Sequence, residues 1–358
     1  MKGWVLPMKR RKLILFSLLS LGLIAAFLVG CASAPTQTEG VAPTTGAATE
    51  VIPPQELVFN GVSYPTDSTA LTVGPYGLEQ LQWVTALTEL EYIGDAPESW
   101  DFLAWLPTLT RLTLHLSAGE TTDLRLDGYE LPALETLEID AECPIGTLTL
   151  PSAAPTDCSI RLSAVTRADT SAAEIDRLFL SLSDAPQELT LGQVSSLTCD
   201  GFAPTPDALE HAVGLRELTL GTAQPLDFLT ALSALDKLSL YGDGWDLSPL
   251  RDTTISALVV PSCDAEALAV LDGMTSLRSL QISDACVTDL ATISVLPRLE
   301  TLAISVDEAQ PGDLPFAAPL TAADAETLAL LETPLPKEQL TAFLEQGGTL
   351  LLLPDYNR

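Results

Sequence analysis

The segment that decides the fold reads LRELTL at residues 215–220, LDKLSL at 235–240, ISALVV at 255–260, LRSLQI at 277–282 and LETLAI at 299–304. Each copy has an apolar residue, two variable residues, a leucine, one variable residue and a second apolar residue. The last two apolar positions are two residues apart, which places them on one face of a short strand. The first apolar residue brings the chain to that strand from the same interior side.

The pattern extends toward both ends of the chain. Further copies begin at Leu87, Leu109 and Leu134, and weaker copies surround Leu71, Ile160, Leu189, Leu328 and Leu350. When the fourth position of each copy is the marker, successive markers are 19 to 29 residues apart and cluster at 20–22. This is the period of a leucine-rich repeat. One coil cannot bury its own leucines, so we predict an α/β solenoid with a parallel β-sheet on the concave face and short helices or irregular returns on the convex face.

Four returns share an aspartate followed by apolar residues, at Asp101, Asp227, Asp246 and Asp289. We interpret these aspartates as caps that accept hydrogen bonds from free amides of short helical turns, rather than as catalytic acids or metal ligands. The strand, the loop and this D-L-x-x-L return together resemble the leucine-rich repeats of internalin-like and other bacterial surface proteins. The resemblance covers roughly residues 65–353.

The sequence departs from that family at one point, because the family often places asparagine after the strand. This chain has only Asn60 and Asn357, and the equivalent positions hold Ala223, Asp243, Ala285 and Asp307. The backbone between coils must therefore be bonded in another way.

We divide the repeat domain, residues 56–353, into four parts: a cap with the first repeats at 56–106, irregular repeats at 120–200, the most regular repeats at 215–305, and a C-terminal cap at 325–353. The strand-like pieces at 124–126, 148–150 and 197–199 are either strands on the back face or part of an irregular insert. Helical spacing predicts one longer helical return at Ser171–Leu182.

The two caps have their own signals. An N-terminal aromatic cluster forms either a packed cap or a ligand platform, and its members are Phe59, Tyr64, Tyr76, Trp83, Trp100 and Trp105. Near the other end we expect a helix at Lys337–Glu345, a stop at Gly347-Gly348 and a last strand at Thr349–Leu353.

The first thirty residues have the plan of a secretory signal: basic residues at 9–12, then an apolar or small run from Leu13 to Gly30. The start is either Met1 or Met8. Leu28-Val29-Gly30-Cys31 resembles the lipobox of bacterial lipoproteins, which implies cleavage before Cys31 and diacylglycerol on its thiol; palmitate is an expected chain. The alternative is an uncleaved transmembrane helix. Residues 31–55 are expected to be the lipid anchor and a disordered tether, with the protein at the cell membrane facing outside the cytoplasm.

The charge is unbalanced, with 48 acidic and 17 basic residues and a net charge of −31. Such a body repels nucleic acid and anionic lipid headgroups. We therefore expect no nucleic-acid partner, and a ligand that is neutral, cationic or bridged by divalent metal.

Residues for chemistry are few. His115 and His211 are the two histidines, about four coils apart, and no motif for a metal site, a nucleophile or a phosphate loop occurs. We expect no enzymatic activity, no metal and no cofactor. Cys263 and Cys286 occupy nearly the same loop of neighbouring coils, so they either form a disulfide or remain two buried thiols.

The outward side chains of the sheet are the candidate binding surface. We select Arg111, His115, Glu138 and Arg161 from its charged half, and Tyr241 with Trp245 as an aromatic pair. The outward set also includes small hydroxylated residues such as Ser239 and Ser283. We expect a monomeric, non-enzymatic module that binds or adheres to a protein, peptide or cell-wall ligand. The alternatives are an envelope scaffold, or an enzyme with an unrecognised acidic site.

Overall fold

The computed structural model describes residues 56–212, 214–283, 298–306, 316 and 318–354. The chain divides into two compact units, Met1–Ile52 and Pro53–Arg358, and the described residues belong to the second. The predicted signal peptide, lipobox and tether lie outside them. None of the helices in this described part is long and apolar enough to cross a membrane.

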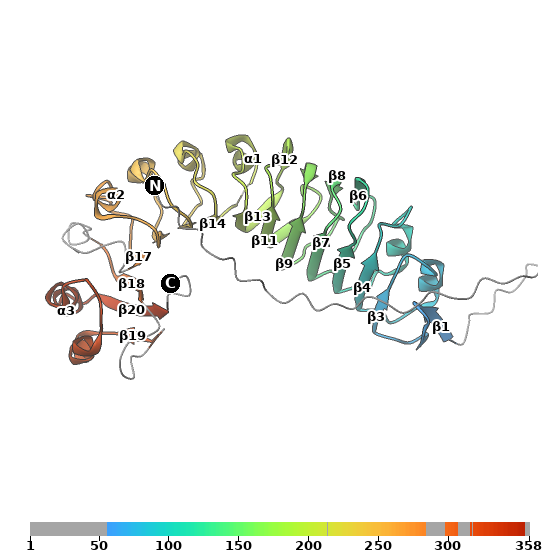
Figure 1. Ribbon diagram of the computed structural model, residues 1–358, viewed down its shortest axis with the longest axis horizontal. Helices are drawn as coiled ribbons and strands as arrows, with labels where there is room; N and C mark the ends of the chain where they lie inside the picture. Colours follow the sequence, from blue (N-terminus) through green and yellow to red (C-terminus); the bar gives the residue numbers. More distant parts are fainter. Residues whose placement is uncertain (1–55, 213, 284–297, 307–315, 317, 355–358) are drawn as a thin grey trace, which may run out of the picture. The chain divides into compact units, whose positions relative to one another are not determined.

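Most strands belong to one long sheet, whose members follow chain order from β3 to β18, with β20 next and β19 at the edge (Figure 1). Its strands are β3 (Ala70–Val73), β4 (Glu89–Gly94), β5 (Arg111–Leu116), β7 (Thr136–Ala141), β9 (Asp157–Leu162), β11 (Glu174–Leu182), β13 (Gln193–Asp200), β14 (Glu217–Leu220), β15 (Lys237–Leu240), β16 (Ala257–Val259), β17 (Ser279–Ser283), β18 (Thr301–Val306), β19 (Pro319–Leu320) and β20 (Thr349–Pro354). Neighbouring strands are parallel, except that β19 runs antiparallel to β20. A parallel sheet built from successive coils is the predicted leucine-rich-repeat solenoid.

The register of this sheet aligns the repeat leucines across the strands. Leu90 pairs with Leu112, Leu218 with Leu238, and Leu302 with Leu350. Marker side chains along this row are almost fully buried, because each contacts the markers of the coils on either side. Burying a leucine side chain is worth about 1.5–3 kcal/mol, so the ladder is the main stabilising feature of the fold.

Three of the weaker markers are wrong. The residue aligned with Leu137 is Cys158, not Ile160. Leu189 lies in a different sheet, and Leu328 lies in a 3-10 helix. Each wrong marker is an apolar residue that is buried or partly buried outside the marker row. Hydrophobicity alone therefore does not distinguish such a residue from a true marker.

Residues 120–200 contain a second sheet on the side of the coil opposite the long sheet (Figure 1). Its strands are β6 (Thr122–Arg125), β8 (Ile145–Thr149), β10 (Val165–Asp169) and β12 (Glu188–Thr190). The strand-like pieces near Leu124 and Leu148 are thus back-face strands, whereas 197–199 belongs to β13 of the long sheet.

The helix predicted at Ser171–Leu182 is wrong, because Glu174–Leu182 forms strand β11. The buried side chains of its second half, Leu178, Leu180 and Leu182, alternate with partly exposed ones. The strand pairs with β9 on one side and β13 on the other, so lateral pairing decides its conformation.

Short helices occupy other returns: η1 (Leu78–Trp83), η2 (Asp101–Trp105), α1 (Pro206–Glu210), η3 (Asp227–Ala231), η4 (Ser248–Asp252), α2 (Ala265–Ala269), η6 (Ala322–Leu330) and α3 (Lys337–Glu345). The expectation that aspartates cap them is only partly right. Asp246 accepts from the Ser248 amide at 2.9 Å. Asp101 accepts instead from the Tyr129 hydroxyl, and η3, which begins at Asp227, has no side-chain cap. Asp289 lies outside the described residues.

A hairpin and an aromatic group close the N-terminal end. Strands β1 (Glu56–Phe59) and β2 (Val62–Pro65) pair antiparallel. Phe59 and Trp100 are buried, and the Trp100 ring lies 5.3 Å from that of Tyr92, centroid to centroid. Tyr76 and Trp105 remain exposed. The predicted aromatic cluster is therefore a packed cap only in part. At the other end, α3 and β20 lie where the sequence predicts them.

Backbone hydrogen bonds join successive coils just before the strands, at the opposite end of the strand from the expected asparagine position. At the start of several strands one carbonyl accepts from two successive amides of the next coil. The Thr88 carbonyl accepts from Thr110 and Arg111, and the Asp236 carbonyl accepts from Ser256 and Ala257. The main chain thus supplies a ladder of its own.

Candidate functional site: the outer face of the long sheet

The candidate site is the side of the long sheet that faces away from the leucine core, called the sheet face below. Strand alternation places three rows of side chains there. The first row is the residue before each marker, the second is the residue after it, and the third is the residue three positions after it. The second row includes Thr72, Glu91, Thr113, Glu138, Ser159, Phe179, Thr198 and Thr219. Because the register fixes these rows, residues far apart in sequence become lateral neighbours.

Ion pairs between adjacent strands cross this face. Arg161 Nη1 lies 3.0 Å from Glu138 Oε1. Arg177 contacts both carboxylate oxygens of Asp157: Nε lies 2.7 Å from Oδ1, and Nη2 lies 2.8 Å from Oδ2. Lys237 Nζ lies 3.6 Å from Glu217 Oε2. All these side chains are partly or largely exposed, so each pair adds at most about 1 kcal/mol to stability. Their larger effect is to hold charged groups in fixed positions.

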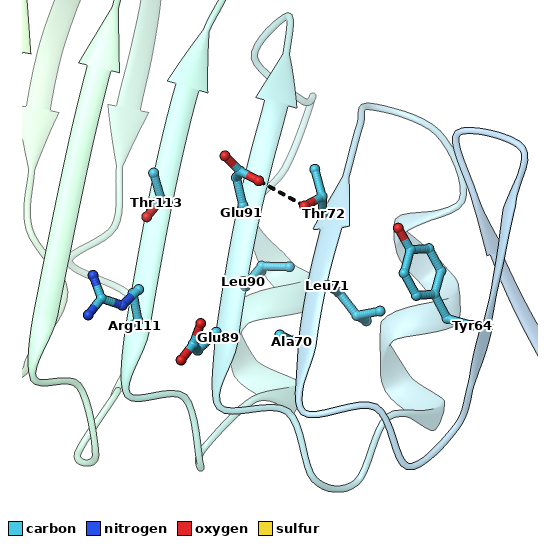
Figure 2. Close-up of a pocket in the computed structure, with 9 residues that line it drawn as sticks. All are labelled: Tyr64, Ala70, Leu71, Thr72, Glu89, Leu90, Glu91, Arg111 and Thr113. Atoms are coloured by element: carbon cyan, nitrogen blue, oxygen red, sulfur yellow. Dashed lines mark hydrogen bonds between the residues drawn. The ribbon is translucent and has the colours of Figure 1, made fainter.

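Near the N-terminal end the sheet face is hollowed by about 320 Å³, between the β1–β2 hairpin and β5 (Figure 2). Tyr64 forms one wall. Thr72 Oγ1 donates to Glu91 Oε2 at 2.8 Å, and His115 Nε2 lies 3.7 Å from the other oxygen of that carboxylate. Glu91 is therefore held between two partners on neighbouring strands.

Arg111 is the one basic side chain that lines this hollow. It is exposed, it stands laterally opposite Glu89, and its guanidinium turns away from that residue (Figure 2). Within the described residues it forms no ion pair, in contrast to Arg161 and Arg177. Its five N–H donors are therefore available to a ligand.

At the middle of the sheet face, Phe179 stands between Ser159 and Thr198 of the adjacent strands. The Arg161 guanidinium carbon lies 5.4 Å from the centre of the Phe179 ring, a cation–π contact. A shallow hollow of about 190 Å³ borders this cluster. It combines an aromatic ring, guanidinium groups and hydroxyls in one place.

Comparisons with solved structures give matches of low TM-score and low identity. An internalin from Listeria monocytogenes matches with a TM-score of 0.31 and 14% identity, over 68% of this chain and 89% of that one. A leucine-rich-repeat protein from Leptospira interrogans matches with a TM-score of 0.30 and 15% identity, over 80% of this chain and 90% of that one. No family model and no curated protein matches the chain. Matches at this level transfer no residue's role.

Four of the predicted site residues lie together on the sheet face. Arg111 and His115 come from β5, and Glu138 and Arg161 come from β7 and β9, the next two strands of the sheet. The structure thus places them on three successive strands, with the Glu138–Arg161 ion pair joining the last two.

The aromatic pair is wrong in its second member. Tyr241 is 45% exposed just beyond β15, but Trp245 is buried and its Nε1 donates to the Tyr241 carbonyl at 3.0 Å. Trp245 therefore packs the loop and offers no ring to a ligand. Ser239 and Ser283 were also expected to be exposed on the outer face, and both are buried.

Phe179 and Arg177 were missed because their segment was assigned to a helix. The signal was present in the sequence, since Leu178, Leu180 and Leu182 alternate with Phe179 and Ser181. An alternating pattern indicates a strand, and it would have placed Arg177 and Phe179 outward.

The described residues contain no group of His, Cys, Asp and Glu side chains arranged to hold a metal ion. His211, at the end of α1, contacts the Asp207 carbonyl through Nδ1 at 2.7 Å. Cys263 is buried, and Cys286 lies outside the described residues, so a bond between them stays a prediction.

Proposed function

We propose that this protein is a non-enzymatic binding module that holds a protein, peptide or cell-wall ligand on its sheet face. The observation that carries this proposal is the presentation of fixed charged, hydroxylated and aromatic side chains along one uninterrupted parallel sheet. A rigid, extended surface of this kind suits recognition, because little side-chain entropy is lost on binding.

The charge of the chain supports a neutral or cationic ligand. A net charge of −31 raises the encounter rate with basic partners and lowers it with nucleic acid and anionic surfaces. Arg111, Arg161 and Arg177 are local basic groups within this acidic body. They favour a partner whose hydrogen-bond acceptors lie opposite their guanidinium groups.

Charge reversal on one face, with a matched reversal on the other, tests the proposal. The sheet-face variant is R111E/R161E. The control is R125E/R167E, which changes two exposed arginines of the second sheet, in β6 and β10, that are ion-paired as Arg161 is. Crosslinking on intact cells, followed by mass spectrometry, identifies what is attached.

We expect the sheet-face variant to lose its specific crosslinked partner while the control keeps it. A partner that is retained equally by both variants contradicts a binding role for the sheet face and favours the scaffold alternative. Circular dichroism of both variants checks that the fold is intact.

We further propose that lipid on Cys31 anchors the module at the cell membrane, with residues 32–55 as a tether. The lipobox-like Leu28-Val29-Gly30-Cys31 supports this, because a thioether-linked diacylglycerol with a further acyl chain holds a protein stably at a bilayer. Metabolic labelling with an alkyne palmitate should mark the wild-type chain and not C31S. Equal labelling of C31S contradicts the anchor.

A further inference from the structure

We infer that the middle of the sheet face carries the main binding contact, a site around Phe179 and Ser159 for an extended peptide segment of a protein partner. The inference rests on the proposed function, because it names the partner and the contact residues of the same face. Four observations carry it: a partly exposed aromatic ring, a hydroxyl that has no partner among the described residues, a bordering hollow, and neutralised charge.

Ser159 is the residue that points to a ligand. Its Oγ is buried and, among the described residues, has no hydrogen-bond partner. Glu138 and Phe179 flank it on the two adjacent strands. Arg161, two residues further along β9, contacts both of them. A buried hydroxyl without a partner costs free energy, which a polar ligand group could recover.

The hollow beside Ser159 gives such a group a place to bind. About 190 Å³ of space is lined by Ser159, Phe179, Thr198, Ser196 and the Asp157–Arg177 pair. Three hydroxyls and one aromatic ring thus border the same space. A peptide main chain offers both N–H donors and C=O acceptors to hydroxyls, and an apolar side chain of the segment can pack against the ring.

The charges of the site favour a peptide over a strongly charged ligand. Arg161 is paired with Glu138, and Arg177 with Asp157, so the two guanidinium groups are locally neutralised. A carboxylate or phosphate ligand would meet both acids at close range. Aromatic and arginine side chains near the centre of a surface are also the composition of protein-binding hot spots.

A phage-displayed library of random linear peptides, selected on the full chain in detergent, tests the inference. The affinities of synthetic copies of the selected peptides are then measured against wild type, F179A, S159A, R111E and the control R167Q on the second sheet. We expect F179A to weaken binding by at least about tenfold, the loss typical of a truncated hot spot, and R167Q to leave it unchanged.

S159A gives a readout that a merely structural role would not produce. Removing an unpartnered buried hydroxyl should leave the thermal midpoint of the free protein equal or higher, while it weakens peptide binding. R161Q, which removes the cation over the ring, keeps the site testable if F179A fails to fold.

The outcomes separate this inference from the proposed function. Peptides whose affinity falls in R111E but not in F179A, S159A or R161Q overturn the inference and leave a binding role for the sheet face. Peptides that bind all sheet-face variants equally, or a selection that yields none dependent on Phe179, also overturn it. Crosslinking of R111E/R161E on cells decides whether the sheet face binds a partner at all, and only the peptide affinities of F179A and S159A, set against R111E, decide where on the face it binds.

Discussion

Two cysteines take positions in the core that other coils give to leucine. Cys158 stands in the marker row between Leu137 and Leu178, and Cys199 aligns with Leu180 and Leu220. Burial raises the pKa of the Cys158 thiol to about 12 and raises that of Cys199 strongly as well. Both side chains therefore behave as small apolar groups at neutral pH.

These thiols make stability fall at alkaline pH. The unfolded chain loses their protons above the ordinary pKa of 9.0, whereas the folded chain keeps the proton of Cys158 up to about pH 12. Stability is thus full below pH 9 and decreases as pH rises through that window, by up to about 1.4 kcal/mol per pH unit for each thiol. Urea unfolding of wild type and C158V/C199V at several pH values measures this. Identical pH slopes for the two proteins would contradict the burial of these thiols.

Single residues were predictable where the repeat fixed their direction. Arg111, His115 and Glu138 follow or precede a marker leucine by a known number of residues, so alternation alone places them outward. Arg161 is also outward, because the wrong marker Ile160 and the true one, Cys158, are two residues apart and share a face. Trp245 lies in the loop after β15, where no alternation applies. Its large apolar ring gains more from burial than from exposure, and its one N–H is satisfied by a backbone carbonyl.

At the scale of elements, the regular strands and the short turns at Asp101, Asp227 and Asp246 were predictable, whereas strand β11 and the form of the other returns were not. A strand of the long sheet repeats one apolar pattern, whereas the returns are 3-10 turns, short helices or strands of the second sheet. Segment 171–182 shows the difficulty, because its apolar residues fit helical spacing as well as strand spacing. Pairing with β9 and β13 decides between them, and such lateral contacts are not visible in a local window of sequence.

The Asp246 side chain should stabilise its turn, and that of Asp227 should not. Asp246 accepts from the side chain and the amide of Ser248, and these bonds lower the pKa of its carboxyl below the usual 3.8. D246A should therefore shift the urea midpoint downward at pH 7, whereas D227A, at the start of an uncapped turn, serves as the matched control. The contribution of a carboxyl with a lowered pKa is lost as pH falls through that pKa, so the two variants should converge in acid. Equal midpoints at pH 7 would contradict a stabilising role for the Asp246–Ser248 hydrogen bonds.

At the scale of the whole molecule, the excess of acidic residues opposes the compact state. The described residues contain six exposed ion pairs formed by arginine or lysine, each worth at most about 1 kcal/mol. The 48 acids of the chain exceed its 17 bases by far, so repulsion outweighs these pairs.

Added salt should therefore stabilise the folded state. Screening reduces repulsion among the carboxylates more than it reduces the attraction within the ion pairs. The urea midpoint at pH 7.5 is expected to rise when sodium chloride is increased from low to physiological concentration. A midpoint that stays constant or falls would mean that the cross-strand pairs dominate, and the R125E/R167E variant would then respond differently from wild type.

The ladder-like pairing of the long sheet has a consequence for how such a chain can change over generations. Each strand bonds only to the strands of the coils before and after it, and the register passes from Leu280 to Leu302 and on to Leu350 across segments of very different length. A duplicated or deleted coil would thus leave every other junction intact. The number of repeats can therefore change in evolution. Gain or loss of whole coils alters the length of the solenoid without changing the core packing of the remaining coils.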